Sequence, residues 1–91
     1  MANEEAKQEP VSTFEDMSIV AYFMLKGRKV IPWKSKDYPV RISFDVHGDL
    51  KRDLDAYHKN DLVGIQDYTQ CFRAVRDMIF NLKNIKDSTK Q

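Results

Sequence analysis

The sequence has few of the residues that build disulfides, metal sites and phosphate-binding loops. Cys71 is the only cysteine, so no disulfide can form within the chain, and the two histidines, His47 and His58, make no paired metal-binding motif. The three glycines stand apart from one another, which excludes the glycine-rich loops that bind nucleotides. We therefore predict that the protein holds no cofactor and no metal ion.

Long apolar runs and a strong excess of one charge are also missing. No stretch approaches the roughly 20 apolar residues that span a bilayer, and Glu4 and Glu5 stand where a secretory signal would be basic. The formal net charge is +1, which gives no general attraction to nucleic acid. We therefore expect a cytoplasmic protein without a membrane partner.

Groups for hydrolytic catalysis form no recognisable motif. Hydrolysis needs a nucleophile beside a base, or two opposed carboxylates. Asp49 and Asp53 share one face of a predicted helix, but Asp55 points elsewhere, and with Lys51 and Arg52 they have the composition of a solvated surface. An enzyme would need a pocket built from distant residues, and a chain of 91 residues has little material to wall it. The sequence therefore predicts a protein that is not an enzyme.

What the chain does contain is the composition of one small folded domain. Hydrophobic residues make up 42% of it and charged residues of both signs 32%, which suits a packed core rather than global disorder. Residues 1–11 are acidic and lack apolar periodicity, so we predict a disordered tail there. We predict a single domain over residues 12–84 and a frayed polar tail over residues 85–91.

A helix followed by a hairpin is predicted for the first half of the domain. Ser12 and Glu15 have the spacing of a capping box at the start of the helix, and Gly27 tolerates the left-handed conformation that ends helices. Strands are predicted at residues 28–33 and 40–46. The second alternates, so Val40 and the other apolar residues are expected to face the core, and Ser43 and the other polar residues to face water. The short link between them predicts an antiparallel hairpin.

Two further helices are predicted in the second half. Asp49 is expected to cap a short helix that ends near His58, and Asp67 a long helix that ends near Asn84. The connector between them, residues 62–66, is expected to tuck against the core. The long helix carries apolar residues at intervals of three and four. They are Tyr68, Cys71, Phe72, Val75, Ile79 and Leu82.

These elements predict an α+β fold. A lone two-stranded hairpin is only marginally stable in water. We therefore expect the three helices to cover the apolar face of the hairpin, in the chain order helix, strand, strand, helix, helix. A domain of this size buries a limited share of its surface, so association with a partner or with a second copy would add stability.

A second stripe runs along another side of the long helix. It is basic and contains one aromatic residue. One interpretation is a solvated face on which the aromatic is exposed or packs on the N-terminal segment. The other is a partner-binding face, because aromatic residues and arginine are enriched where interface energy concentrates. The candidate partner-binding residues are Arg73, Arg76, Phe80 and Lys83.

The predicted hairpin is also basic. Residues 26–41 hold six basic residues and one acid, a net charge of +5. Basic side chains interleaved with aromatics can follow a phosphate backbone and stack on bases. Alternatively, the lysines only protect an exposed sheet edge from pairing. The candidate nucleic-acid-binding residues are Lys29, Trp33, Lys34, Lys36 and Arg41.

Three segments carry a family resemblance. Residues 19–27 form an apolar helix that ends in Leu-Lys-Gly before a strand, residues 42–45 read Ile-Ser-Phe-Asp, and residues 72–81 combine an aromatic, a basic pair and a closing Ile-Phe-Asn. With them, the stretch from residue 16 to 83 resembles a family of short bacteriophage and mobile-element proteins known only as a domain of unknown function. Phe80 stands where such proteins often have tyrosine.

The resemblance implies a phage-like origin, no known reaction or cofactor, and action by binding a host or phage macromolecule within the host cytoplasm. The leading hypothesis is a non-enzymatic adaptor or inhibitor that binds another protein through the last helix and the basic hairpin. The alternative is a nucleic-acid-binding module that uses the hairpin.

Overall fold

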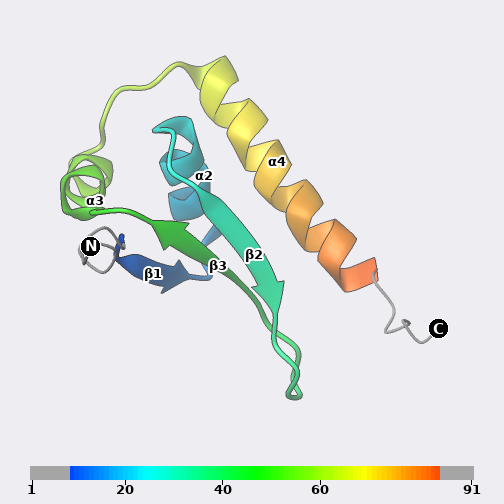
Figure 1. Ribbon diagram of the computed structural model, residues 1–91. Helices are drawn as coiled ribbons and strands as arrows, with labels where there is room; N and C mark the ends of the chain where they lie inside the picture. The colour runs from blue at the N-terminus through cyan, green and yellow to red at the C-terminus, as the bar shows by residue number, and fades with distance from the viewer. Residues whose placement is uncertain (1–8, 85–91) are drawn as a thin grey trace, which may run out of the picture.

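The computed structural model describes residues 9–84, which form three helices and a three-stranded antiparallel sheet (Figure 1). The predicted α+β class is confirmed, but the two-stranded sheet is wrong, because a strand precedes the first helix. The predicted frayed tail and residues 1–8 of the predicted disordered tail lie outside the described residues. The elements are β1 (Val11–Phe14), α2 (Met17–Leu25), β2 (Val30–Lys34), β3 (Ile42–His47), α3 (Lys51–His58) and α4 (Ile65–Asn84).

The additional strand β1 lies at one edge of the sheet, whose order is β1-β3-β2. Val11 pairs with His47 and Phe14 with Phe44 in antiparallel register. The N–H of Gly48 donates to the carbonyl of Pro10 at 2.9 Å and extends the pairing beyond the strand. Residues 10 and 11, predicted as part of the tail, therefore join the sheet.

The first helix begins later than predicted. Ser12 lies in β1, and α2 is capped by Asp16, whose Oδ1 accepts the N–H groups of Ser18 and Ile19 at 2.8 and 3.3 Å. The predicted capping box of Ser12 and Glu15 is therefore wrong. The cap moves because the segment before Asp16 pairs with β3, a distant contact that local spacing does not reveal.

The predicted hairpin of β2 and β3 is confirmed as an antiparallel pair, with Val30 opposite Val46 and Lys34 opposite Ile42. Figure 1 shows the link between these strands running beyond the sheet, at the end of the molecule where α4 also ends. Val40 was predicted to face inward with the rest of β3. It is 50% exposed because it lies in this link, before β3 begins.

The sheet has one covered and one open face. Phe44 and Val46 pack into the core with residues of α2, whereas Ile31 and Trp33 point the other way and are 42% and 41% exposed. Ser43 shares the open face and was predicted to be solvated, but it is only 4% exposed. Trp33 lies opposite Ser43, and the Ser43 hydroxyl donates to a Glu15 oxygen at 3.4 Å, which accounts for its burial.

Helix α4 lies along α2 and completes the core (Figure 1). Val75 is fully buried with Val20, Ala21 and Phe44, and the predicted apolar stripe of α4 packs around this group. The helix begins at Ile65 instead of being capped by Asp67, because the carbonyl of Gly64 already accepts the Tyr68 N–H at 2.9 Å. Asp67 lies within the first turn, where its negative charge interacts favourably with the helix dipole and stabilises α4.

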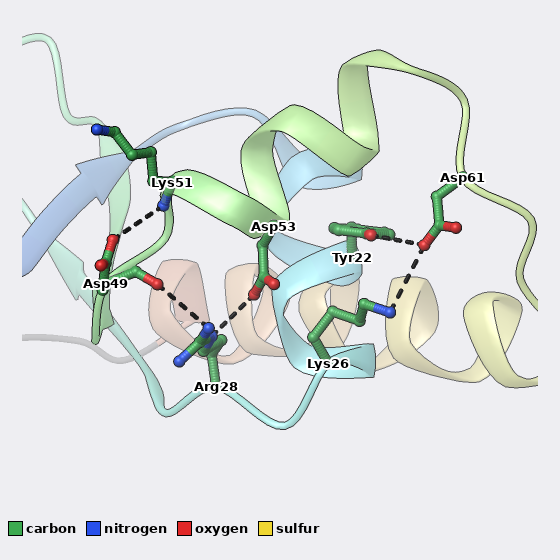
Figure 2. A network of polar contacts seen from close by, with 7 residues as sticks. All are labelled: Tyr22, Lys26, Arg28, Asp49, Lys51, Asp53 and Asp61. Atoms are coloured by element: carbon green, nitrogen blue, oxygen red, sulfur yellow. Dashed lines mark hydrogen bonds and ion pairs between the residues drawn. The ribbon is translucent and has the colours of Figure 1, made fainter.

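Short α3 is fixed to the rest of the molecule by charged groups (Figure 2). Arg28 Nε donates to Asp53 Oδ2 at 2.8 Å, and Arg28 Nη2 donates to the carbonyl of Asp49 at 3.2 Å. Leu50 occupies the N-cap position of α3, while Asp49 Oδ1 accepts the Lys51 N–H at 3.2 Å. The Asp53 carboxylate and the Asp49 carbonyl therefore tie this segment to Arg28, while the Asp49 carboxylate binds the first turn of α3.

Candidate functional site

The second stripe of α4 lies on the surface. Phe80 is 66% exposed, and Arg73, Arg76 and Lys83 are exposed as well. Each of the four directly follows a residue of the core-facing stripe, and one residue corresponds to a rotation of about 100° around a helix. Packing of the first stripe against α2 therefore turns the second stripe toward solvent.

Few carboxylates of the described residues pair with the cations of this stripe. Arg76 Nη2 lies 3.6 Å from Asp77 Oδ1, and the two side chains are 62% and 66% exposed. Exposed pairs of this kind contribute only about 0–1 kcal/mol to stability. Within residues 9–84, Arg73 and Lys83 make no ion pair. These charges are therefore available to a partner.

The stripe continues toward the start of α4, which sequence reasoning missed. Ile65 is 75% exposed and precedes half-buried Thr69 by four residues, and Thr69 precedes Arg73 by four. Leu62, just before the helix, is 93% exposed. The prediction that residues 62–66 tuck against the core is therefore wrong. The four-residue spacing of Ile65, Thr69 and Arg73 is the sequence signal that could have placed Ile65 in the stripe. We call the following set the α4 stripe: Ile65, Thr69, Arg73, Arg76, Phe80 and Lys83.

The basic residues of the hairpin do not form one surface. Lys34 Nζ donates to the Leu82 carbonyl at 3.2 Å, so this ammonium binds the last turns of α4. Trp33 lies on the opposite, open face of the sheet. Arg41 Nε lies 3.8 Å from a Glu15 oxygen, and Lys29 and Lys36 are exposed. The structure thus separates Lys34 from the other candidate nucleic-acid-binding residues.

An acidic side chain lies beside Trp33 on the open face. Asp45 Oδ1 accepts hydrogen bonds from Trp33 Nε1 at 3.0 Å and from the Thr13 hydroxyl at 2.9 Å. These bonds link side chains of three neighbouring strands, β1, β3 and β2, on the open face. A carboxylate at this place opposes the approach of a phosphate, while the exposed ring offers a surface for stacking.

A pocket of about 530 Å³ lies between α2, α3 and the start of α4. Three tyrosines line it, and each hydroxyl has an internal partner. Tyr22 donates to Asp61 at 2.7 Å, Tyr57 lies 3.0 Å from the Ser18 hydroxyl, and Tyr68 donates to the Ser18 carbonyl at 3.0 Å. These hydrogen bonds join three segments of the fold.

Two of the phenols in this pocket, those of Tyr22 and Tyr68, have raised pKa values. Burial, together with the hydrogen bond to Asp61, raises the pKa of Tyr22 to about 12. The Tyr22 hydroxyl lowers the pKa of Asp61, and Lys26, 3.5 Å from Asp61, acts in the same direction (Figure 2). Burial also raises the pKa of the Cys71 thiol and of Tyr68. At neutral pH Tyr22 and Tyr68 are therefore protonated hydrogen-bond donors that stabilise the fold.

Two further findings concern the described part of the chain. Among residues 9–84, no three histidine, cysteine, aspartate or glutamate side chains come close enough to hold a metal ion. No helix in the same range combines the length and the apolar character needed to cross a membrane.

Comparisons with protein-family models, curated proteins and solved structures found no match to this chain. The resemblance to short phage and mobile-element proteins therefore stays a prediction. A proposal for function therefore starts from the geometry of the surface, and the α4 stripe is one part of that surface where exposed apolar side chains and charges of one sign occur together.

Proposed function

We propose that this protein is a small non-enzymatic adaptor or inhibitor of the phage type that binds another protein through α4 and the end of the basic hairpin. The observation that carries the proposal is Phe80, which is 66% exposed within a line of cations on a helix whose other side lies in the core. Transfer of a phenylalanine side chain from water to an interface contributes about 1.5–3 kcal/mol.

The rigid attachment of α4 supports this proposal. Val75 is fully buried, the Tyr68 hydroxyl donates to the Ser18 carbonyl near the start of the helix, and Lys34 donates to the Leu82 carbonyl near its end. A surface held at its middle and at both ends loses little conformational entropy on binding. The contact between Lys34 and Leu82 also brings the hairpin to the same end of the molecule as Phe80.

A photo-crosslinking experiment tests the proposal. The photoreactive residue p-benzoylphenylalanine replaces Phe80 in the full chain, expressed in the cells that carry its gene. The control places it at Asn81, which is exposed and about 100° away around the helix. We expect protein adducts that form from position 80 and not from position 81. Equal adducts from both positions, or none from position 80, would contradict binding through this surface.

Nucleic-acid binding through the hairpin is the second candidate, and exposed Trp33 favours it. Lys29 and Lys36 are exposed nearby in sequence, but Asp45 lies against the indole and Lys34 is engaged by α4. A fluorescence titration with single- and double-stranded oligonucleotides at two salt concentrations separates the candidates. Affinity that falls steeply with salt and is lost in Trp33→Ala would favour this function. Absence of binding at low salt would end it.

A further inference from the structure

The residues of the α4 stripe are spaced as they would be if a second helix packed alongside α4. Its members follow one another at intervals of four, four, three, four and three residues, from Ile65 to Lys83. Side-by-side helices make contact at such intervals, because an average of about 3.5 residues keeps one line of side chains facing the neighbour. The stripe is roughly 27 Å long at about 1.5 Å per residue. A straight helical partner can therefore touch all of it.

Charge decides what kind of helix fits. Arg73 and Arg76 occupy the middle of the α4 stripe, and Lys83 follows at its end. The one acid that meets them is Asp77, 3.6 Å from Arg76 in an exposed pair, when residues 9–84 are considered. Three cations brought into an interface need carboxylates opposite them, because charges that are desolvated without a partner oppose binding.

The same charges argue against a second copy of this chain. The stripe runs from residue 65 to residue 83, so its midpoint lies at residue 74, between the two arginines. In an antiparallel pair of α4 stripes, Arg73 of one copy would face Arg76 of the other. In a parallel pair, each arginine would face itself. Both arrangements place like charges together, which is unfavourable.

Exposed apolar side chains flank the arginines. Ile65 is 75% exposed and Phe80 is 66% exposed, and they are 15 residues apart, roughly 22 Å or four helical turns. Leu62, 93% exposed, adds to the apolar surface before the helix. A matching helix would carry apolar residues about four turns apart and acidic residues between them.

We propose that the α4 stripe binds an acidic amphipathic helix of another protein, at least about 15 residues long, with Asp or Glu opposite the arginines and apolar side chains opposite Ile65 and Phe80. This inference rests on the proposed function and names the chemistry of the partner.

The test maps where the partner is touched. The photoreactive residue replaces Ile65 in one variant and Phe80 in another, and mass spectrometry locates the adducts. We expect both positions to mark one acidic, helix-forming segment of one protein, about four turns apart. Adducts with a second copy of this chain, with nucleic acid, or with a segment lacking acids would overturn the inference. Of these, a protein segment without acids would leave the proposed function standing, whereas the lack of any position-specific adduct would remove both.

A charge exchange completes the test with a synthetic, fluorescently labelled peptide of the marked segment. Arg73→Glu together with Arg76→Glu is expected to weaken peptide binding by about tenfold or more, measured by fluorescence polarisation. A peptide in which the two facing acids are replaced by lysine should recover binding to this variant and lose binding to the wild type. Circular dichroism confirms that the variant is folded. Equal affinity of both peptides for both proteins would overturn the inference.

Discussion

Phe80 and Val75 lie in the same helix and have opposite surroundings. Val75 is fully buried in the core, and Phe80 is 66% exposed. A side chain of the core contributes to stability through the water it excludes and the contacts it makes. An exposed side chain contributes little until something covers it, so these two residues separate the folding role of α4 from its proposed binding role.

We expect Phe80→Ala to change the free energy of unfolding by less than about 0.5 kcal/mol, because the side chain is already in water. Val75→Ala should cost about 2 kcal/mol, because it removes buried methyl groups and leaves a cavity. Urea denaturation measures both. In the peptide-binding assay, Phe80→Ala should weaken binding by about tenfold or more. A large loss of stability in Phe80→Ala would mean that Phe80 packs within the protein and is not free for a partner.

At the scale of elements, periodic patterns predicted the helices well and the first strand not at all. Helix α4 follows from apolar residues at intervals of three and four, a pattern contained in the helix itself. Strand β1 has four residues, and its partner β3 begins at Ile42, far along the chain. A short strand whose hydrogen bonds go to a distant segment leaves no local signal, so local spacing alone predicts Ser12 as a helix cap.

The position of the cap gives a prediction for a matched pair of variants. Asp16→Ala should lower the free energy of unfolding by about 1 kcal/mol, because the N–H groups of Ser18 and Ile19 lose their acceptor. Ser12→Ala, at an exposed position of β1, should change it by less than about 0.5 kcal/mol. Thermal or urea unfolding at neutral pH measures both. The reverse order of effects would restore the capping box that the sequence suggested.

The same cap predicts a dependence on pH. Hydrogen bonding, first of all by the Ser18 hydroxyl, lowers the pKa of Asp16 in the folded protein. A carboxyl with a lowered folded-state pKa stabilises the protein at pH values above its unfolded pKa, about 3.9, and loses this contribution as the pH falls through the folded pKa. The stability difference between wild type and Asp16→Ala should therefore be constant near pH 7 and shrink on acidification below about pH 4. A difference that grows on acidification would contradict the role of the carboxylate.

The ion pair between Arg28 and Asp53 attaches α3 to the rest of the protein. Asp53 is 13% exposed in its side chain and accepts from Arg28 at 2.8 Å, whereas Asp55 pairs with Lys59 at 3.3 Å with both side chains more than half exposed. We expect Asp53→Ala to cost about 1–2 kcal/mol, since it leaves the Arg28 guanidinium without its carboxylate. The control, Asp55→Ala, should cost less than about 0.5 kcal/mol. Urea denaturation compares the two, and equal effects would contradict a structural role for Asp53.

At the scale of the whole molecule, helices cover one face of the sheet and α4 presents its second stripe outward. The hairpin meets the end of α4 through Lys34 and Leu82. The two basic regions predicted from the sequence, the hairpin and the second stripe of α4, therefore approach each other at one end of the molecule (Figure 1). The open sheet face, with Trp33 held by Asp45, is a separate surface. The favoured binding surface and the hairpin's aromatic surface are thus different parts of the molecule.

The arrangement of charge on the whole molecule predicts its behaviour on its own. Because Arg73 and Arg76 would face like charges in a symmetric pair of α4 stripes, we expect no self-association through this surface. In analytical ultracentrifugation, wild type and Phe80→Ala should sediment as the same species over a range of concentrations. A dimer of the wild type that is lost in Phe80→Ala would show that the stripe binds a second copy.

Local sequence patterns were enough to predict the α+β class, the hairpin, the end of α2 at Gly27 and the two stripes of α4, because each depends on residues close together in the chain. Three features depend on the packing of the folded chain: β1 joins the sheet, Lys34 binds the Leu82 carbonyl, and exposed Ile65 extends the α4 stripe. The physical reason is that exposure and hydrogen-bond partners depend on which distant segments come to lie together. A helical pattern states which residues share a side, but the packing of α4 on α2 determines which side faces solvent.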